Sequence, residues 1–363
     1  MSSSGRKWSI RPYRDGDEDG ILELWKAVYP EHTYDREQWM KWWQWMYRAN
    51  PNGMGVIFLA EQEGRIVGHT AEIPVMMKIG SGSVLVGISL DAMTHPDYRR
   101  QGTFVALVKA RSVESEKRGI RATYGFRNKF SYPYPALADK VGMFDGATMQ
   151  KVLRPLDWKN ALRTQTQNRF LLTIGSATGG LLSTVFFRAR NKPLSKGLTV
   201  AQEPHFDDRI NDLWRRVSSQ YQAIVSRNME YLNWRYVAVP HRDYSIYLAS
   251  RSETVAGYLV VGRREADSAR IAIIVDVLAE SEEVAECLIS KAVAHCRLDK
   301  RDLIWSARIA GTSLARAYRR NGFVSVPFAK SIGIKGRSSS PSIARQMQNP
   351  KNWFLQMGDS DEA

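Results

Sequence analysis

Apolar and polar residues alternate between Val84 and Leu90, which predicts a β-strand with one buried face. Pro96 cannot donate to a strand ladder, so we expect the strand to end before it. A basic turn containing Gly102 follows, and the next residues resemble a helix that ends at Gly119. The pattern therefore predicts a strand, a turn and a helix in succession.

Further elements are predicted on both sides of this unit. Ile21, Leu24, Trp25 and Val28 share one face of a helix, because their spacing follows the helical period. Strands are expected at residues 9–12, 56–61, 65–77 and 122–126, and a last helix at 136–144. This order of elements is typical of an α/β domain with a sheet covered by helices.

A weak internal repeat divides the chain. Shifting the sequence by 189 residues, so that Trp45 meets Trp234, aligns residues 45–68 with 234–257 without a gap and gives eight identities over 24 positions. Each copy has the pattern of helix end, loop, strand, turn and strand. We therefore expect two related domains, with boundaries at 1–157 for the first, 158–197 for a connector, 198–335 for the second and 336–363 for a linker and docking tail.

Composition fits this division. The 363 residues are 44% hydrophobic, enough for packed cores in two domains. The formal net charge is +15, and residues 158–197 contribute seven basic residues and no acid. No zinc finger or basic zipper accompanies this charge, so we expect an anionic ligand or membrane surface rather than specific nucleic acid.

The connector contains an apolar segment, residues 170–187, between arginines. Two hypotheses remain open for it. A buried helix or hairpin between the domains is one, and a peripheral contact with an anionic membrane surface is the other.

Only two cysteines occur, Cys287 and Cys296, in a segment that resembles one helix. Nine residues apart, they face different sides of that helix and cannot form a disulfide there. The N-terminus lacks the apolar core of a signal peptide. Together these features predict a cytoplasmic protein, and the histidine spacing indicates no metal site.

The turn at Gly102 has the chemistry of a phosphate site. Glycine allows close approach of the backbone, and the positive end of the following helix favours an anion. Arg99 and Arg100 add charge.

This segment resembles the acyl-CoA site of the GNAT superfamily of N-acyltransferases, and in particular the enhanced-intracellular-survival acetyltransferases. Arg99 and Gly102 match the family signature, while Phe104 stands where a small residue is usual. The resemblance implies an α/β (α+β) fold of two GNAT-like domains, each a mixed, mostly antiparallel sheet flanked by helices. It implies acetyl-CoA or another acyl-CoA as co-substrate, bound by Met93, Thr94, His95, Arg99, Arg100, Gln101, Gly102, Thr103, Phe104 and Asn128.

The implied reaction is transfer of an acyl group, not an aminoacyl group, from the thioester to an amine of a small molecule, amino sugar or protein. It needs a base, an oxyanion donor and an acid for the thiolate. The family's usual tyrosine is replaced by Ala138, so Tyr132 and Tyr134 are the candidate acids. Asp91 is the candidate base, with Glu72 as an alternative, and a backbone N–H near Met93 the candidate oxyanion donor.

The second copy lacks a comparable turn. Its strand is followed by Glu280, Glu282, Glu283 and Glu286, which would repel phosphate at that helix start. LARAYRRNGF at 314–323 nevertheless resembles the GNAT closing motif. We therefore expect a degenerate GNAT-like domain that does not bind CoA.

Two other functions remain open. One is aminoacyl-tRNA-dependent transfer of the peptidoglycan-bridge type, and the other is a non-catalytic adaptor in assembly of a cell-surface glycan. Acyl-CoA binding distinguishes the first hypothesis from both.

Two aromatic clusters complete the predictions. The tryptophans of residues 39–45 recur at helical spacing, which favours core packing over a sugar-binding groove. Trp353 and Phe354 follow a serine-rich segment that resembles a flexible linker. The tail is expected either to close over the acceptor site of the first domain, presenting Asp359 and Asp361, or to pack on the second domain.

Overall fold

The structure is a computed structural model that describes residues 8–31, 35–126, 139–157, 160, 197–266, 269–309, 314–325 and 332–360. The chain forms two compact units. Unit 1 comprises residues 1–147, 238–241 and 333–352, and unit 2 comprises 148–237, 242–332 and 353–363. Each unit is thus built from separate stretches of chain.

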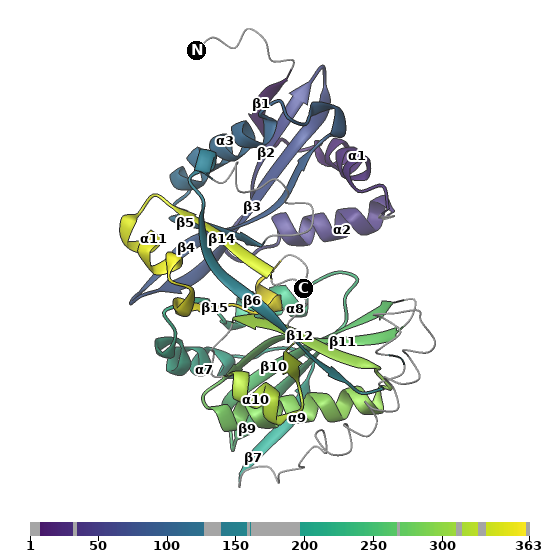
Figure 1. The fold of residues 1–363 in the computed structure, drawn as a ribbon, viewed down its shortest axis with the longest axis vertical. Helices are drawn as coiled ribbons and strands as arrows, with labels where there is room; N and C mark the ends of the chain where they lie inside the picture. The colour runs from purple at the N-terminus through teal and green to yellow at the C-terminus, as the bar shows by residue number, and fades with distance from the viewer. Residues whose placement is uncertain are drawn as a thin grey trace. The chain divides into compact units, whose positions relative to one another are not determined.

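Unit 1 contains a sheet with helices on both faces (Figure 1). Its strands are β1 (Ser9–Pro12), β2 (Val56–Gln62), β3 (Arg65–Ile79), β4 (Gly82–Thr94), β5 (Ala122–Phe126) and β14 (Ile332–Ser338). Its helices are α1 (Glu18–Val28), α2 (Arg36–Tyr47), α3 (Thr103–Lys117) and α11 (Pro341–Gln348), with 3₁₀ turns η1 (Pro96–Tyr98), η2 (Asp139–Val141) and η4 (Pro350–Asn352).

Unit 2 repeats this plan. Its strands are β6 (Phe144–Pro155), which begins in unit 1, β7 (Leu198–Glu203), β8 (Ala223–Val225), β9 (Tyr244–Arg251), β10 (Thr254–Ala266), β11 (Ala269–Ala279), β12 (Leu303–Ile309), β13 (Val324–Ser325) and β15 (Trp353–Phe354). Its helices are α7 (Arg209–Val217), α8 (Met229–Tyr236), α9 (Glu282–Leu298) and α10 (Leu314–Arg320), with 3₁₀ turns η3 (Ser218–Gln220) and η5 (Met357–Asp359).

The strand order is the same in both units. Unit 1 has the order β1-β2-β3-β4-β5-β14, and unit 2 has β7-β9-β10-β11-β12-β6. Along each order the described pairs are antiparallel except β4 with β5 and β11 with β12, which α3 and α9 connect as crossovers. The predicted fold class, a mixed and mostly antiparallel sheet flanked by helices, is confirmed.

The closing strand of each sheet comes from a distant part of the chain. In unit 1, β14 pairs antiparallel with β5, and Ser338 lies opposite Ala122. In unit 2, β6 pairs antiparallel with β12, and Pro155 lies opposite Leu303. The strand that follows the first copy therefore completes the second sheet, and the strand that follows the second copy completes the first.

Alternate residues of β3 face opposite helices, as strand geometry requires. A side chain at Gly68 would touch Leu107 and Thr103 of α3, and Ser115 of α3 donates to the Glu72 carboxylate. The intervening residues therefore face the side of α1 and α2. On α2, Trp39, Trp43 and Trp45 are buried and Trp42 is half-buried, so core packing is confirmed for three of the four tryptophans.

Two local predictions were wrong. The segment expected to be a flexible linker forms β14 and α11, because distant partners stabilise it: Arg337 pairs with Glu116 at 3.0 Å. The helix expected at 136–144 is, in its described part, only the η2 turn before β6 begins at Phe144.

Candidate active site

The predicted phosphate turn lies between β4 and α3. Arg100 and Gly102 both adopt the left-handed backbone conformation, with φ of 62° and 80°. A side chain at Gly102 would meet no atom within 4 Å, so glycine is required here by the backbone angle and not by crowding. The turn thus bends the backbone sharply at the start of α3, where amide groups can surround an anion.

Helix α3 begins without a side-chain cap. Gly102 occupies the N-cap position, and the first turn contains no acid. The Thr103 hydroxyl does not cap the helix, because it donates to the carbonyl of Tyr98 at 3.3 Å. The positive end of α3 is therefore free of side-chain compensation, as an anion site requires.

The side chains predicted to bind acyl-CoA form an exposed group and a packed group. Those of residues 99–102 are exposed, whereas Met93 and His95 are buried and Thr94 and Phe104 are half-buried. Arg99 donates from Nε to the carbonyl of Thr94 at 3.3 Å. Gln101 donates to the carbonyl of Asp97 at 3.1 Å, so its amide supports the turn. Arg65, which the sequence did not single out, lies 2.9 Å from Nε2 of His95.

Strand β4 extends beyond its pairing with β5. The parallel pairing covers Val86 to Ile88 opposite Ala122 to Tyr124, whereas β4 continues to Thr94. Backbone groups near this end of β4 therefore have no ladder partner on the β5 side among the described residues. They can bond an extended ligand whose phosphates lie at the start of α3.

Asp91 lies at an irregularity in β4. The register with β3 shifts so that Asp91 and Ala92 both stand opposite Thr70, between the pairs of His69 with Met93 and Ala71 with Leu90. Asp91 has a positive φ of 48°, which is strained for a residue with a side chain. Strain of this kind concentrates at functional positions.

Two side chains from other elements hold Asp91. The hydroxyl of Tyr47, at the end of α2, donates to Oδ2 of the carboxylate. Nδ1 of His69, on β3, lies 2.7 Å from the carbonyl oxygen of Asp91, so Nδ1 carries the proton and donates. The other carboxylate oxygen, Oδ1, has no hydrogen-bond partner among the described residues.

Burial shifts both titrating groups toward their neutral forms. Desolvation raises the pKa of the Asp91 carboxyl, opposed by His69 and by the hydrogen bond from Tyr47. Desolvation also lowers the pKa of His69, opposed by Asp91. A carboxyl with a raised pKa and one available oxygen can accept a proton from an amine near neutral pH.

Glu72 has a different role. It is fully buried under α3, where it accepts from Ser115 and lies 3.8 Å from Nε of Arg111. Its side chain also fills the space above Gly87, where a Cβ atom would come within 2.2 Å. The structure therefore places Glu72 in the packing of α3 on the sheet, away from Asp91.

The remaining predicted site residues, Asn128, Tyr132 and Tyr134, lie outside the described residues, as do Ala138 and residues 170–187. Their roles stay predictions. The sequence missed Tyr47, which falls in the repeat, and His69, which directly follows it: shifting by 189 residues brings Tyr47 onto Tyr236 and His69 onto Tyr258.

The corresponding region of unit 2 is occupied by the C-terminal tail. Strand β11 extends past its pairing with β12, which stops at Ile273 and Trp305. Gln356 lies between the two strands: its amide bonds the backbone of Val277 on β11 at 2.9 and 3.1 Å, and its backbone forms a bridge with Arg308 on β12.

The tail is also anchored by a buried ion pair. Asp359 lies 2.8 Å from Arg227, and both side chains are inaccessible to solvent. A side chain at Gly358 would collide with the hydroxyl of Tyr236. Trp353 and Phe354 pair with β8 of unit 2. Of the two expected positions for the tail, the structure shows packing on the second unit, and Asp359 is not presented to an acceptor; Asp361 lies outside the described residues.

The start of α9 differs from that of α3. Ser281 caps α9 by accepting from the backbone of Val284 at 3.3 Å, and Glu282 and Glu283 fill the first turn. Arg316 and Arg320 pair with Glu282. The positive end of this helix is therefore already compensated within the chain.

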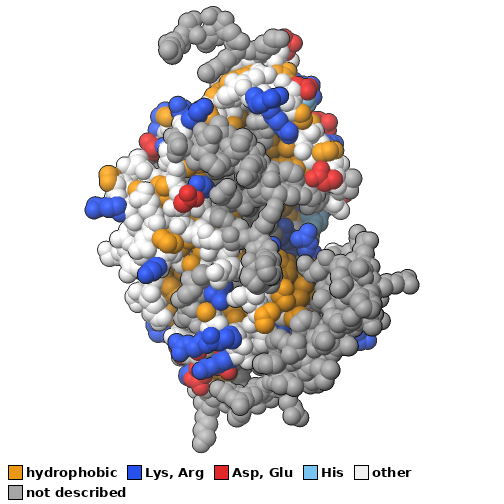
Figure 2. Space-filling view, viewed as in Figure 1, with side chains coloured by type: hydrophobic (Ala, Val, Ile, Leu, Met, Phe, Trp, Pro, Cys, Tyr) orange, Lys and Arg blue, Asp and Glu red, His pale blue; other side chains and the backbone are white. Residues whose placement is uncertain are grey.

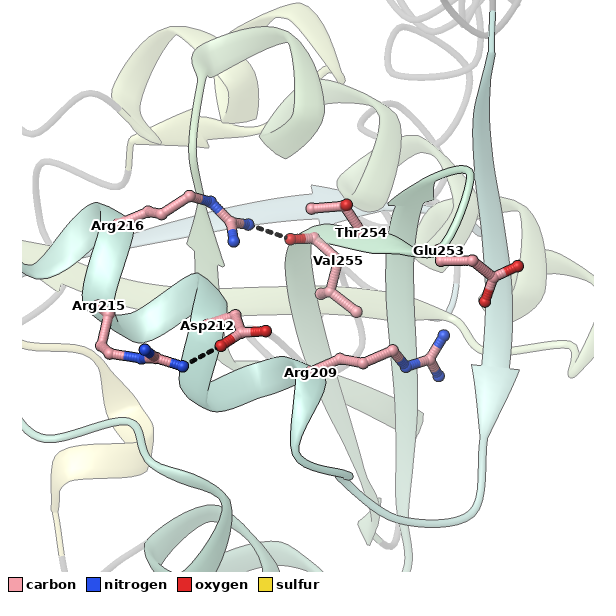
Figure 3. A pocket seen from close by; sticks show the side chains of 7 residues that line it. All are labelled: Arg209, Asp212, Arg215, Arg216, Glu253, Thr254 and Val255. Atoms are coloured by element: carbon pink, nitrogen blue, oxygen red, sulfur yellow. Dashed lines mark hydrogen bonds and ion pairs between the residues drawn. The ribbon is translucent and has the colours of Figure 1, made fainter.

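A hollow of about 280 Å³ lies elsewhere in unit 2, between α7 and the turn from β9 to β10 (Figure 3). Three arginines line it, but each has a partner. Arg209 pairs with Asp207 at 2.7 Å, Arg215 with Asp212, and Arg216 donates to the carbonyl of Val255 at 2.6 Å. We therefore do not assign a ligand to it.

The predictions of no specific nucleic-acid partner and no metal concern how basic and metal-binding side chains are distributed. On the face shown in Figure 2, the coloured Lys and Arg side chains lie in several separate groups. In the described part of the chain, no group of three or more His, Cys, Asp or Glu side chains is placed to hold a metal ion.

The next two features are membrane-spanning helices and the cysteine pair. Among the described residues, no helix is both long enough and apolar enough to span a bilayer. Cys287 and Cys296 both lie on α9 and are not joined by a disulfide, as predicted. Burial raises the pKa of Cys296 to about 12, which makes it an inert thiol.

Comparison with known proteins identifies the class of fold. Residues 9–134 match the family model described as "Acetyltransferase (GNAT) domain", a range that contains β1 to β5 and the uncapped start of α3. The predicted GNAT resemblance is confirmed. No curated protein sequence is significantly similar to this chain.

Solved structures with this fold are similar over most of the chain. A GCN5-related N-acetyltransferase from Anabaena variabilis has 12% identity and a TM-score of 0.65, covering 92% of this chain and 73% of that one. Eis1 from Mycobacterium abscessus has 14% identity and a TM-score of 0.56, covering 91% and 73%. Saccharomyces cerevisiae N-myristoyltransferase, solved with bound myristoyl-CoA and inhibitors, has 12% identity and a TM-score of 0.60, covering 92% and 80%. At these identities the likeness establishes the GNAT fold.

Proposed function

We propose that unit 1 is an acyl-CoA-dependent N-acyltransferase, with acetyl-CoA as its donor. The observation that carries this proposal is the uncapped start of α3 after the left-handed residues Arg100 and Gly102. The pyrophosphate would lie there, and the pantetheine arm would follow the end of β4 from His95 to Met93. Arg99 and Arg100 would add charge, while Thr103 and Phe104 would line the helix start.

Asp91 would act as the base. A neutral amine attacks the thioester carbonyl, the C–N bond forms, and the amine proton passes to Oδ1 of Asp91, the oxygen without a partner among the described residues. A backbone N–H near Met93 would donate to the oxyanion. When the C–S bond breaks, the departing thiolate takes a proton, for which Tyr132 and Tyr134 remain the candidates.

The two units would form a tandem in which only unit 1 binds CoA. In unit 2, the helix start carries its own cap and acids, and Gln356 fills the place between β11 and β12. The acceptor class is an amine of a small molecule, amino sugar or protein. We place the protein in the cytoplasm, with a peripheral contact of residues 170–187 at the inner membrane surface as part of the proposal.

Isothermal calorimetry of the intact chain with acetyl-CoA tests the proposal. We expect one molecule bound per chain. Absence of binding would overturn it and favour the two functions that do not need CoA, aminoacyl-tRNA-dependent transfer or a non-catalytic adaptor. Two molecules per chain would contradict the assignment of unit 2.

Asp91→Asn tests the base. The asparagine can still accept from Tyr47, so acetyl-CoA affinity should stay within about twofold, whereas turnover with a panel of amines should fall about 100-fold, as expected for loss of a general base. Wild-type turnover in this variant would remove Asp91 from the mechanism and leave the CoA site unaffected.

A further inference from the structure

In both units, the tyrosine at the end of a helix bonds an aspartate on a strand. In unit 1, Tyr47 donates to Asp91, and in unit 2, Tyr236 donates to Asp276 at 3.0 Å. The tyrosines are exact equivalents under the shift of 189 residues, and each aspartate lies beside a register shift in its strand. The Tyr–Asp pair is therefore a shared feature of the two sites.

The next residue of the group differs between the units. In unit 2, the hydroxyl of Tyr258 donates to Oδ2 of Asp276 at 2.9 Å, beside the bond from Tyr236. The side-chain amide of Gln356 donates to Oδ1 at 2.7 Å. Both oxygens of the Asp276 carboxylate are thus occupied, and the side chain is completely buried.

His69 stands at the position of Tyr258 and bonds a different atom. It donates to the backbone carbonyl of Asp91, so that among the described residues Tyr47 is the side chain that bonds the carboxylate. This bond fixes the peptide at the residue with φ of 48°, where the backbone is strained. In unit 2, Oδ1 of the aspartate is occupied by Gln356 and not by Tyr258, whereas Oδ1 of Asp91 has no partner among the described residues.

The surroundings of His69 keep it neutral. Its side chain is 1% exposed, and Nε2 has no hydrogen-bond partner among the described residues. Among the described residues, Asp91 from β4 and Arg111 from α3 act on His69 electrostatically, and the ring of Tyr47 from α2 lies beside it. Burial and Arg111 both disfavour the imidazolium, so no positive charge forms beside Asp91 to weaken it as a base.

We propose that His69 is a positioning residue for acyl transfer: by bonding the carbonyl of Asp91 and not its carboxylate, it holds the base in its strained conformation and adds no hydrogen bond that would make the carboxylate less basic. This inference rests on the proposed function. A tyrosine at this position would instead add a second hydrogen bond to Oδ2 of the carboxylate, as Tyr258 does beside Tyr236 in unit 2.

Two variants separate this role from simple packing. His69→Tyr copies the arrangement of unit 2, whereas His69→Asn keeps an N–H group that can reach the same carbonyl. Each is measured for acetyl-CoA affinity, for turnover across pH, and for the pKa of the Asp91 carboxyl by carbon NMR. The NMR measurement needs neither turnover nor a known acceptor.

In His69→Tyr, we expect turnover to fall at least about tenfold while acetyl-CoA affinity stays within about twofold. The added hydrogen bond stabilises the charged carboxylate, so the pKa of Asp91 should fall by about one pH unit. The pH below which turnover declines should fall by the same amount. In His69→Asn, turnover should stay within about threefold of wild type, with the pKa of Asp91 unchanged.

An unchanged pKa of Asp91 in His69→Tyr would overturn the proposal, and so would wild-type turnover in that variant. Loss of turnover in His69→Asn equal to that in His69→Tyr would also overturn it, because the bond to the carbonyl would then not suffice. A wild-type chain that does not bind acetyl-CoA would instead refute the proposed function, while the NMR result would still decide whether His69 controls Asp91.

Discussion

The two units of this chain are built on the same strand order and the same Tyr–Asp pair, but they differ in whether polar groups of the chain itself bond the carboxylate and the helix start. In unit 1, α3 begins at an uncapped glycine, and Asp91 keeps a carboxylate oxygen without a described partner. In unit 2, Ser281 caps α9, and the tail saturates Asp276 through Gln356. The same scaffold therefore offers its polar groups to a ligand in one unit and satisfies them internally in the other.

This difference shows what a ligand site requires of a fold. Backbone and side-chain groups at a cleft must be bonded by something, because leaving them unsatisfied is unfavourable. Unit 2 supplies its own partners from residues 353–360, whereas the described part of unit 1 supplies none at the start of α3. A binding unit is therefore distinguished from a supporting unit by the polar groups that the chain leaves unsatisfied, more than by the strand order.

The largest expected effect is on the free energy of unfolding, through the buried ion pair of the tail in unit 2. Asp359→Ala removes the carboxylate that lies 2.8 Å from the inaccessible Arg227, and it leaves that charge with Asp276 alone. We expect the free energy of unfolding to fall by about 3 kcal/mol, measured by urea denaturation of the intact chain.

A matched control for that variant is Asp212→Ala in the same unit. Its ion pair with Arg215 is 56% and 75% exposed, so the change should stay within about 0.5 kcal/mol. Equal effects of the two substitutions on the free energy of unfolding would mean that the buried ion pair of the tail does not stabilise unit 2.

Gly102→Glu tests the proposed CoA site of unit 1. The substitution puts a carboxylate where the pyrophosphate is proposed and strains a backbone with φ of 80°. Acetyl-CoA affinity, measured by calorimetry, should fall at least about 100-fold, which corresponds to about 2.7 kcal/mol.

Gly119→Glu controls for the strain. Gly119 has a φ of 81° and, like Gly102, open space around it, but it follows the other end of α3. The two variants should lose similar stability, and only Gly102→Glu should lose affinity. Unchanged affinity in Gly102→Glu would remove this turn from the proposed site.

A smaller effect is expected from the arginines of the turn. Replacing Arg99 and Arg100 together by alanine should weaken acetyl-CoA binding about tenfold and reduce its dependence on salt, because the exposed charges act through solvent. Arg118→Ala, at the far end of α3, is the control and should leave affinity unchanged. Full affinity in the double variant would assign the pyrophosphate to the backbone alone.

The smallest effect concerns pH and stability. The pKa of His69 is lowered by burial, so below its ordinary value of 6.5 the unfolded chain takes up a proton that the folded chain does not. Stability should therefore fall as pH decreases from 6.5, by at most about 1.4 kcal/mol per pH unit. His69→Asn should remove this part of the slope, which urea denaturation at several pH values measures. An identical slope in the variant would show that His69 does not titrate as an isolated buried group.

The sequence predicted the parts of the site that depend on neighbouring residues. Alternation from Val84 to Leu90, the stop before Pro96 and the glycine at 102 are local signals, and the structure contains the corresponding strand, turn and helix. Acids after Glu280 similarly indicated the altered helix start of unit 2.

Features that depend on pairing between distant residues were missed. His69 meets Asp91 only because a register shift between β3 and β4 brings the two together, and periodicity does not encode such a shift. The serine-rich segment after residue 335 resembled a linker because its partners are remote: Ser338 donates to the carbonyl of Arg121, 217 residues earlier. Local polarity could not reveal that this segment completes a sheet.

The reciprocal placement of β6 and β14 has a consequence during protein synthesis. While the ribosome makes the first half of the chain, β5 has no β14 to pair with, because Ser338 of that strand lies 217 residues downstream of Arg121, which directly precedes β5. The edge of β5 must stay unpaired or be shielded until nearly the whole chain has emerged, and unpaired strand edges favour aggregation. Such long-range pairing also slows folding. Nascent chains cut short before residue 332 should therefore depend on chaperones, and genes split between the two copies should yield halves that fold only when produced together.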